Sequence, residues 1–65
     1  MDTSKMAARL KELRGKKTQA KVCEEMQIPQ STYAMYEAGR RVPSDEMKIK
    51  IARYYKRSVQ SIFFT

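Results

Sequence analysis

Residues 18–43 read TQAKVCEEMQIPQSTYAMYEAGRRVP, and the interpretation of the whole chain depends on this stretch. Apolar residues recur at helical spacing on both sides of a break in its middle. The Ile28–Pro29 step disfavours continued α conformation, and Pro29 suits the start of a new helix. The pattern therefore predicts a short helix, a turn, a second helix that ends at Gly39, and a basic loop.

The second of these helices, expected at residues 30–38, divides into two unlike faces when successive residues are placed 100° apart. The side expected to be buried carries Thr32, Tyr33, Tyr36 and Glu37. The outward side carries Gln30, Ser31, Ala34, Met35 and Ala38. A surface helix without charge on its outward face is unusual in a chain whose residues are 32% charged. We therefore expect a partner to dock on this face.

The flanking sequence predicts three more helices. The first covers residues 4–14, with Ser4 as its N-cap and Gly15 as its stop. The fourth begins after Ser44, and the fifth covers residues 59–64 after Ser58. The fourth helix is expected to bury a stripe of four residues, Met47, Ile51, Ala52 and Tyr55. Its residues Lys48, Lys50 and Arg53 are expected to face water. Residues 1–65 are thus expected to form one all-α domain, a compact bundle of five short helices.

Cysteine and tyrosine in this bundle each have an alternative to simple packing. A cysteine can be a redox sensor, and tyrosines can stack on the bases of single-stranded nucleic acid. Cys23 is expected to be a small core residue beside Val22 and Met26, because no basic neighbour shares its face to make the thiol reactive. The tyrosines at helical spacing are expected in the core, and only Tyr54 is expected to be exposed.

Composition excludes several classes of protein. A single cysteine and no histidine leave no disulfide and no zinc or haem ligand set, so no cofactor is expected. No apolar run reaches the roughly 18 residues of a membrane span, and the N-terminal residues lack the apolar core of a signal peptide, which indicates the cytoplasm. An enzyme with a small-molecule substrate is not expected, because no general base or nucleophile set is present.

The charge balance points to a polyanionic partner. Fourteen Lys and Arg against seven Asp and Glu give a net charge of +7. Nucleic acid is the first expectation, with an acidic protein or membrane surface behind it. The alternative is that the charge only keeps the protein soluble.

The sequence resembles the Cro/C1-type helix-turn-helix family of phage repressors and bacterial regulators over roughly residues 6–64. The most specific match is the segment Tyr36-Glu37-Ala38-Gly39-Arg40. Gln19, Val22-Cys23, Ile28, Ser31-Thr32, Pro43-Ser44, Ile51-Ala52 and residues 58–63 match in the same order and spacing. The sequence departs from the commonest pattern at residues 14–19, which are shorter, and at Lys56-Arg57, which replaces a Gly-Val pair.

The resemblance implies that double-stranded DNA is the partner and that the helix at residues 30–38 reads its major groove. Matched residue by residue, the base-reading positions are Gln30, Ser31, Ala34 and Met35. A glutamine at the first position can pair with adenine, and Met35 or Ala34 can touch a thymine methyl group. A repressor is the expected kind of regulator.

The resemblance also implies phosphate contacts. Gln19 matches a glutamine that bonds a phosphate, although an ordinary polar first-turn residue remains an equal alternative. Arg40 and Arg41 are expected beside a phosphate strand. Lys16, Lys17 and Lys21 add positive potential, although a solvated position is the commoner situation for each lysine alone.

Within the same resemblance, Glu37 matches a glutamate that pairs with an arginine of the first helix, here Arg14.

Two alternatives stay open: the kind of partner and the oligomeric state. The same fold also serves as a protein-binding adaptor, antitoxin or antirepressor. Phe63 and Phe64 offer a contact for a homodimer, or else the terminus frays with one exposed phenylalanine.

Overall fold

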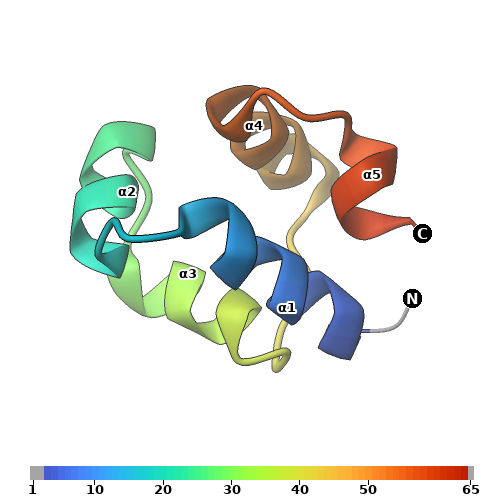
Figure 1. Ribbon diagram of the computed structural model, residues 1–65, viewed down its shortest axis with the longest axis horizontal. Helices are drawn as coiled ribbons and strands as arrows, with labels where there is room; N and C mark the ends of the chain where they lie inside the picture. Colours follow the sequence, from blue (N-terminus) through green and yellow to red (C-terminus); the bar gives the residue numbers. More distant parts are fainter. Residues whose placement is uncertain (1–2, 65) are drawn as a thin grey trace.

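The computed structural model describes residues 3–64. In that range the chain is all-α, as predicted, and forms five helices and no strand. They are α1 (Thr3–Arg14), α2 (Gln19–Met26), α3 (Gln30–Glu37), α4 (Asp45–Tyr55) and α5 (Val59–Phe63). Figure 1 shows α2 and α3 at one end, α5 at the other, and α1 running between them.

Side-chain caps begin three of the helices where the sequence predicts them. Thr18 Oγ1 accepts from Lys21 N at 3.1 Å, Ser44 Oγ accepts from Met47 N at 3.3 Å, and Ser58 Oγ accepts from Ser61 N at 3.1 Å. Each bond satisfies a donor that the first helical turn leaves without a partner. The prediction for α1 is wrong by one residue, because Ser4 lies inside the helix and not at its cap.

The helix ends use the left-handed backbone conformation. Gly15 and Gly39 adopt φ values of 59° and 71°, and a Cβ on Gly39 would lie 3.3 Å from Thr3 O. Gln27 and Lys56, which end α2 and α4, adopt φ values of 60° and 57° without being glycine. α3 and α5 each end one residue earlier than the sequence predicts, at Glu37 and Phe63.

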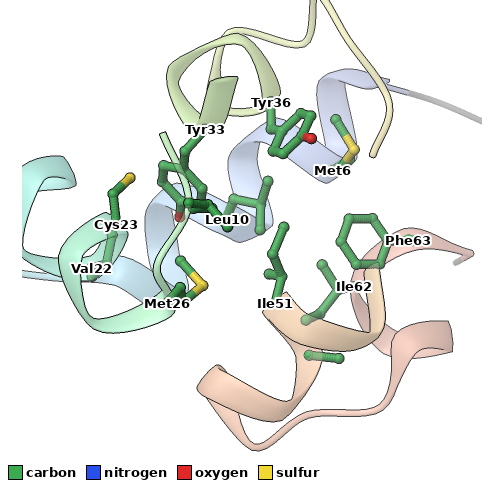
Figure 2. Close-up of a cluster of buried hydrophobic side chains, with 12 residues drawn as sticks. Met6, Leu10, Val22, Cys23, Met26, Tyr33, Tyr36, Ile51, Ile62 and Phe63 are labelled. Atoms are coloured by element: carbon green, nitrogen blue, oxygen red, sulfur yellow. The ribbon is translucent and has the colours of Figure 1, made fainter. Parts of the chain in front are cut away.

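All five helices contribute to one apolar core. Figure 2 shows Met6 and Leu10 of α1 against Tyr33 and Tyr36 of α3, with Ile51 of α4 opposite them. The other large members are Val22, Cys23 and Met26 from α2, Ile28 from the turn, and Ile62 and Phe63 from α5. Cys23 is buried with a raised pKa, first because of its burial, as expected of a packing residue. The core holds α2 and α3 against α1, and this leaves the far side of α3 exposed.

The expectation that Lys48 faces water is wrong. Its side chain is buried, since the end of α5 folds back over α4. The ammonium lies 4.7 Å from the centroid of the Phe64 ring and 3.8 Å from Asp45 Oδ1. The aliphatic stem of a lysine packs on apolar surface while its charged end stays near the edge.

The expectation that Tyr54 is exposed is also wrong. The residue is half-buried and packs beside the core, with its ring edge-on to Tyr55 at 4.9 Å between centroids. Its hydroxyl donates to the Glu25 carboxylate of α2, and the Lys17 ammonium lies 5.6 Å from its ring centroid. Its burial results from this α2–α4 packing, which the spacing within α4 does not reveal.

Candidate nucleic-acid interface

The outward face of α3 carries short or flexible uncharged side chains. Gln30, Ser31 and Met35 are exposed, and Ala34 is half-buried between them. Met35 is 41% exposed, a large value for an apolar side chain in the middle of a helix. On the opposite side Tyr33, Tyr36 and Glu37 are buried and fix the rotation of the helix. The exposed face can therefore meet a flat or convex partner without any rearrangement of α3.

A buried polar cluster joins α3 to α1 and α2. Arg14 holds the Glu37 carboxylate with two nearly parallel hydrogen bonds, from Nε to Oε2 at 2.8 Å and from Nη2 to Oε1 at 3.1 Å. Gln19 Nε2 donates to the same Oε1 at 3.0 Å. The third arginine donor, Nη1, bonds Lys17 O at 2.7 Å. One carboxylate thus connects the start of α2 and the end of α1 to the end of α3.

The cluster keeps Glu37 ionised. Burial raises the pKa of its carboxyl, but hydrogen bonds from Arg14, Gln19 and Tyr33 outweigh burial and leave the pKa below its ordinary value. Tyr33 in turn shares a 2.6 Å hydrogen bond with the hydroxyl of Tyr55 in α4, and burial raises the pKa of Tyr33 far above its ordinary value. Both tyrosines therefore stay neutral and the single charge of Glu37 is balanced by Arg14.

Arg40 and Arg41 follow the end of α3 directly. Arg40 N bonds Met35 O at 3.0 Å, which attaches the loop to the last turn of α3. Both arginines are exposed, and neither side chain forms a hydrogen bond or ion pair among residues 3–64. Two positive charges without partners therefore lie beside the uncharged face of α3.

The three lysines of the sequence prediction fall into two groups. Lys16 is exposed at the corner between α1 and α2. Lys17 Nζ lies 3.3 Å from Glu25 Oε1, and Lys21 Nζ lies 3.7 Å from Glu25 Oε2. This carboxylate also accepts from Tyr54 of α4, and Lys17 Nζ bonds the same tyrosine hydroxyl at 3.3 Å. The structure brings these two lysines together at Glu25.

A protein-family model described as helix-turn-helix matches residues 10–62 of the chain. The chain belongs to the Cro/C1-type helix-turn-helix family. Its members are DNA-binding regulators, a class that is not typically enzymatic. No curated protein and no solved structure matched the chain in the other two comparisons.

Two contacts hold α2 against α4, in addition to the Tyr33–Tyr55 hydrogen bond that joins α3 to α4. Lys50 Nζ donates to Gln27 O at 3.3 Å, at the turn where α2 ends. One turn of α4 further on, Tyr54 donates to Glu25. The first contact places a positive charge at the negative end of the α2 dipole. Sequence reasoning missed both, because the partners are 23 and 29 residues apart and no local pattern marks them.

Phe63 and Phe64 have different surroundings. Phe63 is 2% exposed and belongs to the core, so it cannot supply a contact to a second copy as the sequence prediction assumed. Phe64 is 57% exposed.

Residues 3–64 contain no helix long and apolar enough to cross a membrane. Nor does this range hold a group of three acidic, cysteine or histidine residues placed to bind a metal ion.

Proposed function

We propose that this protein is a sequence-specific regulator of transcription, a repressor, which binds double-stranded DNA by placing α3 in the major groove. The observation that carries the proposal is the exposed, uncharged face of α3 followed directly by two unpaired arginines. A helix with polar and small residues outward suits the groove floor, where base edges present donors, acceptors and methyl groups. The flanking positive charges suit the phosphate strands.

Each residue of the face has a role in this proposal. Gln30 stands in the first turn of α3 and has both a donor and an acceptor, as pairing with the N6 and N7 of adenine requires. Ser31 bonds a base edge or phosphate, and Ala34 allows a close approach to the groove floor. Met35 packs on a thymine methyl group.

The proposed phosphate contacts are ranked by how exposed each side chain is and by whether it already forms an ion pair or hydrogen bond within the protein. Arg40, Arg41 and Lys16 have no partner among residues 3–64 and supply most of the charge. Gln19 keeps a second amide hydrogen and its carbonyl oxygen beyond the bond to Glu37, so it can brace α3 and also bind a phosphate. Lys17 and Lys21 contribute less, since they already share Glu25.

The protein is also proposed to act as a homodimer joined through Phe64. The ring is exposed but held in place by the Lys48 ammonium 4.7 Å from its centroid, which argues against a frayed terminus. A two-fold dimer would bind a palindromic site with half-sites about 34 Å apart. As a repressor, the protein would act by occupying such a site in a promoter. The proposal places the protein in the cytoplasm, with the nucleoid.

Selection of bound duplexes from a random library tests the proposal. The wild-type protein should enrich one motif. Gln30→Ala should relax preference at one position of the motif by about 1 to 3 kcal/mol, while the other positions are retained. Gln60→Ala, at an exposed site on α5, is the matched control and should leave the motif intact.

The main alternative, a protein-binding adaptor, antitoxin or antirepressor, predicts a different result. If no duplex shifts in a gel at about 50 mM salt, where phosphate contacts are strong, DNA binding is refuted and a protein partner for α3 is favoured. A promoter–reporter assay with the selected site then decides the direction of regulation, with lower expression expected.

A further inference from the structure

A second basic surface lies at the C-terminal end of α4. Residues 47–64 contain five Lys and Arg and no Asp or Glu. Two of the five are engaged within the protein, since Lys48 is buried and Lys50 donates to the end of α2. The other three are exposed, and their side chains form no hydrogen bond or ion pair among residues 3–64. These three, called the α4 patch below, are Arg53, Lys56 and Arg57.

The α4 patch and the outward face of α3 lie on opposite sides of the molecule. Tyr33 of α3 and Ile51 of α4 point into the core from opposite sides (Figure 2). Arg53 follows Ile51 by two residues, which on an α-helix is a rotation of about 200°, so it points away from the core. Figure 1 shows α3 and α4 on opposite sides of α1. A duplex on α3 would therefore leave the α4 patch uncovered.

The distance between the two faces separates them electrostatically. The molecule measures 26 × 22 × 21 Å. Its two faces are thus about two Debye lengths apart at 0.1 M salt, where one Debye length is about 10 Å. The charges of the α4 patch therefore add little to the binding of a duplex on α3, and they remain able to bind a different anion.

The chemistry of the α4 patch favours a phosphate strand over an acidic protein. A protein interface takes much of its binding energy from buried aromatic and apolar anchors. Of the large apolar side chains that are exposed, only Ile49 is near, one turn before Arg53 at the edge of the patch. Binding to a phosphate strand needs no apolar anchor, because it is driven by cations that displace counterions from the duplex.

We propose that the α4 patch binds the phosphate backbone of a second DNA duplex without reading its sequence, so that one protein bridges two duplexes. This inference rests on the proposed binding of DNA by α3. A duplex carries one negative charge per about 1.7 Å of its axis, so cations within one helical turn can meet neighbouring phosphates. Glu12 of α1 lines a groove with Arg57 and lowers the potential there, so Arg53 and Lys56 supply most of the binding.

A bridging assay tests this inference. A duplex with the selected motif is attached to beads and loaded with one protein per site, and capture of a fluorescent duplex without the motif is measured. The wild type should capture the second duplex at about 50 mM salt. Its affinity for that duplex should fall about 40-fold at about 200 mM salt, as expected for three phosphate contacts.

Variants locate the second site. Arg53→Gln/Lys56→Gln should lower capture at least tenfold and leave the affinity for the selected duplex within threefold of wild type. Lys5→Gln/Lys11→Gln removes the same charge from exposed positions of α1 and should lower capture less than threefold. Circular dichroism confirms that both double variants fold.

The outcomes separate this inference from the proposed function. If no duplex is selected at all, DNA binding by α3 fails and the bridging fails with it. If the selected duplex binds but the beads capture no second duplex, only the bridging is overturned. Equal capture by the two double variants would also overturn it. A poly-glutamate peptide that displaces the second duplex at equal concentration of charge would instead assign the α4 patch to an acidic protein.

Discussion

At the scale of single residues, Glu37 organises the helix-turn-helix unit. Its carboxylate is 2% exposed and accepts hydrogen bonds from Arg14 and Gln19, so it connects three helices at one point. Such a group contributes by holding the parts in one arrangement, because the cost of burying its charge offsets much of the attraction. The position of α3 relative to Gln19 depends on this carboxylate.

Replacing Glu37 by Gln should destabilise the protein by about 3 kcal/mol, because the Arg14 guanidinium loses its counter-charge while remaining mostly buried. Urea denaturation at 25 °C measures the change. Glu24→Gln, on the exposed side of α2, is the control and should stay within about 0.5 kcal/mol of wild type. Equal stability of the Glu37 and Glu24 variants would show that the cluster contributes nothing.

The same carboxylate makes stability dependent on pH. The pKa of Glu37 in the folded protein lies below the ordinary 4.5 of the unfolded chain, so its contribution is complete above pH 4.5 and is lost as pH falls through the folded pKa. The difference in unfolding free energy between wild type and Glu37→Gln should therefore shrink below pH 4.5. A difference that stays constant from pH 7 to pH 3 would contradict this assignment.

At the scale of elements, the residues that end the helices offer the clearest opportunity to change the stability of the protein. Two of the four left-handed helix ends are occupied by glycine, but Gln27 and Lys56 adopt the same conformation with a Cβ. That conformation costs an ordinary residue on the order of 1 kcal/mol more than it costs glycine, and the greater freedom of glycine in the unfolded chain offsets part of this difference. Both side chains are exposed, so they pack nothing that would compensate.

Lys56→Gly should therefore stabilise the protein by about 0.5 to 1 kcal/mol, and Gln27→Gly by a similar amount. Thermal melting followed by circular dichroism measures both. Lys56→Ala separates the causes, because it removes the charge but keeps the Cβ and should give no gain. If the alanine variant were stabilised as much as the glycine variant, charge and not backbone strain would explain the effect.

At the scale of the whole molecule, the distribution of charge matters more than its total. The net charge of +7 includes lysines whose charge is shared with nearby carboxylates. Only cations without a partner near α3 should release counterions when a duplex binds. The structure thus ranks basic residues that composition treats as equivalent.

Arg40→Ala should lower the slope of log affinity against log salt by about 0.9 and weaken all sequences alike. Lys17→Ala should change the slope much less, since Glu25 already balances part of its charge. Duplex titrations between about 50 and 200 mM salt measure both slopes. Equal losses in the two variants would contradict the ranking.

Dimerisation also belongs to this scale. Phe64→Ser should weaken the proposed dimer at least tenfold in sedimentation equilibrium. Ile49→Ser, which removes a comparably exposed apolar side chain from α4, should not. A wild-type protein that sediments as a monomer even with a palindromic duplex would eliminate the dimer and leave one domain per half-site.

The amino-acid sequence by itself determined where four of the five helices begin and end to within one residue, and which side of α3 is buried. These features depend on residues at most four apart: hydroxyl caps, glycine stops and the helical spacing of Tyr33, Tyr36 and Glu37. The Arg14 partner of Glu37 came only from the family resemblance, because no spacing rule connects residues 23 apart.

Only the tertiary structure decided which side chains are buried between helices and which charged groups meet there. Lys48 is buried because α5 folds over α4, and Tyr54 packs because α2 presents Glu25 to it. The same packing places the Lys17 ammonium 5.6 Å from the centroid of the Tyr54 ring of α4. Each of these outcomes depends on which helices become neighbours. That choice is made by burial of the shared core, which is a property of the whole chain and not of any local pattern.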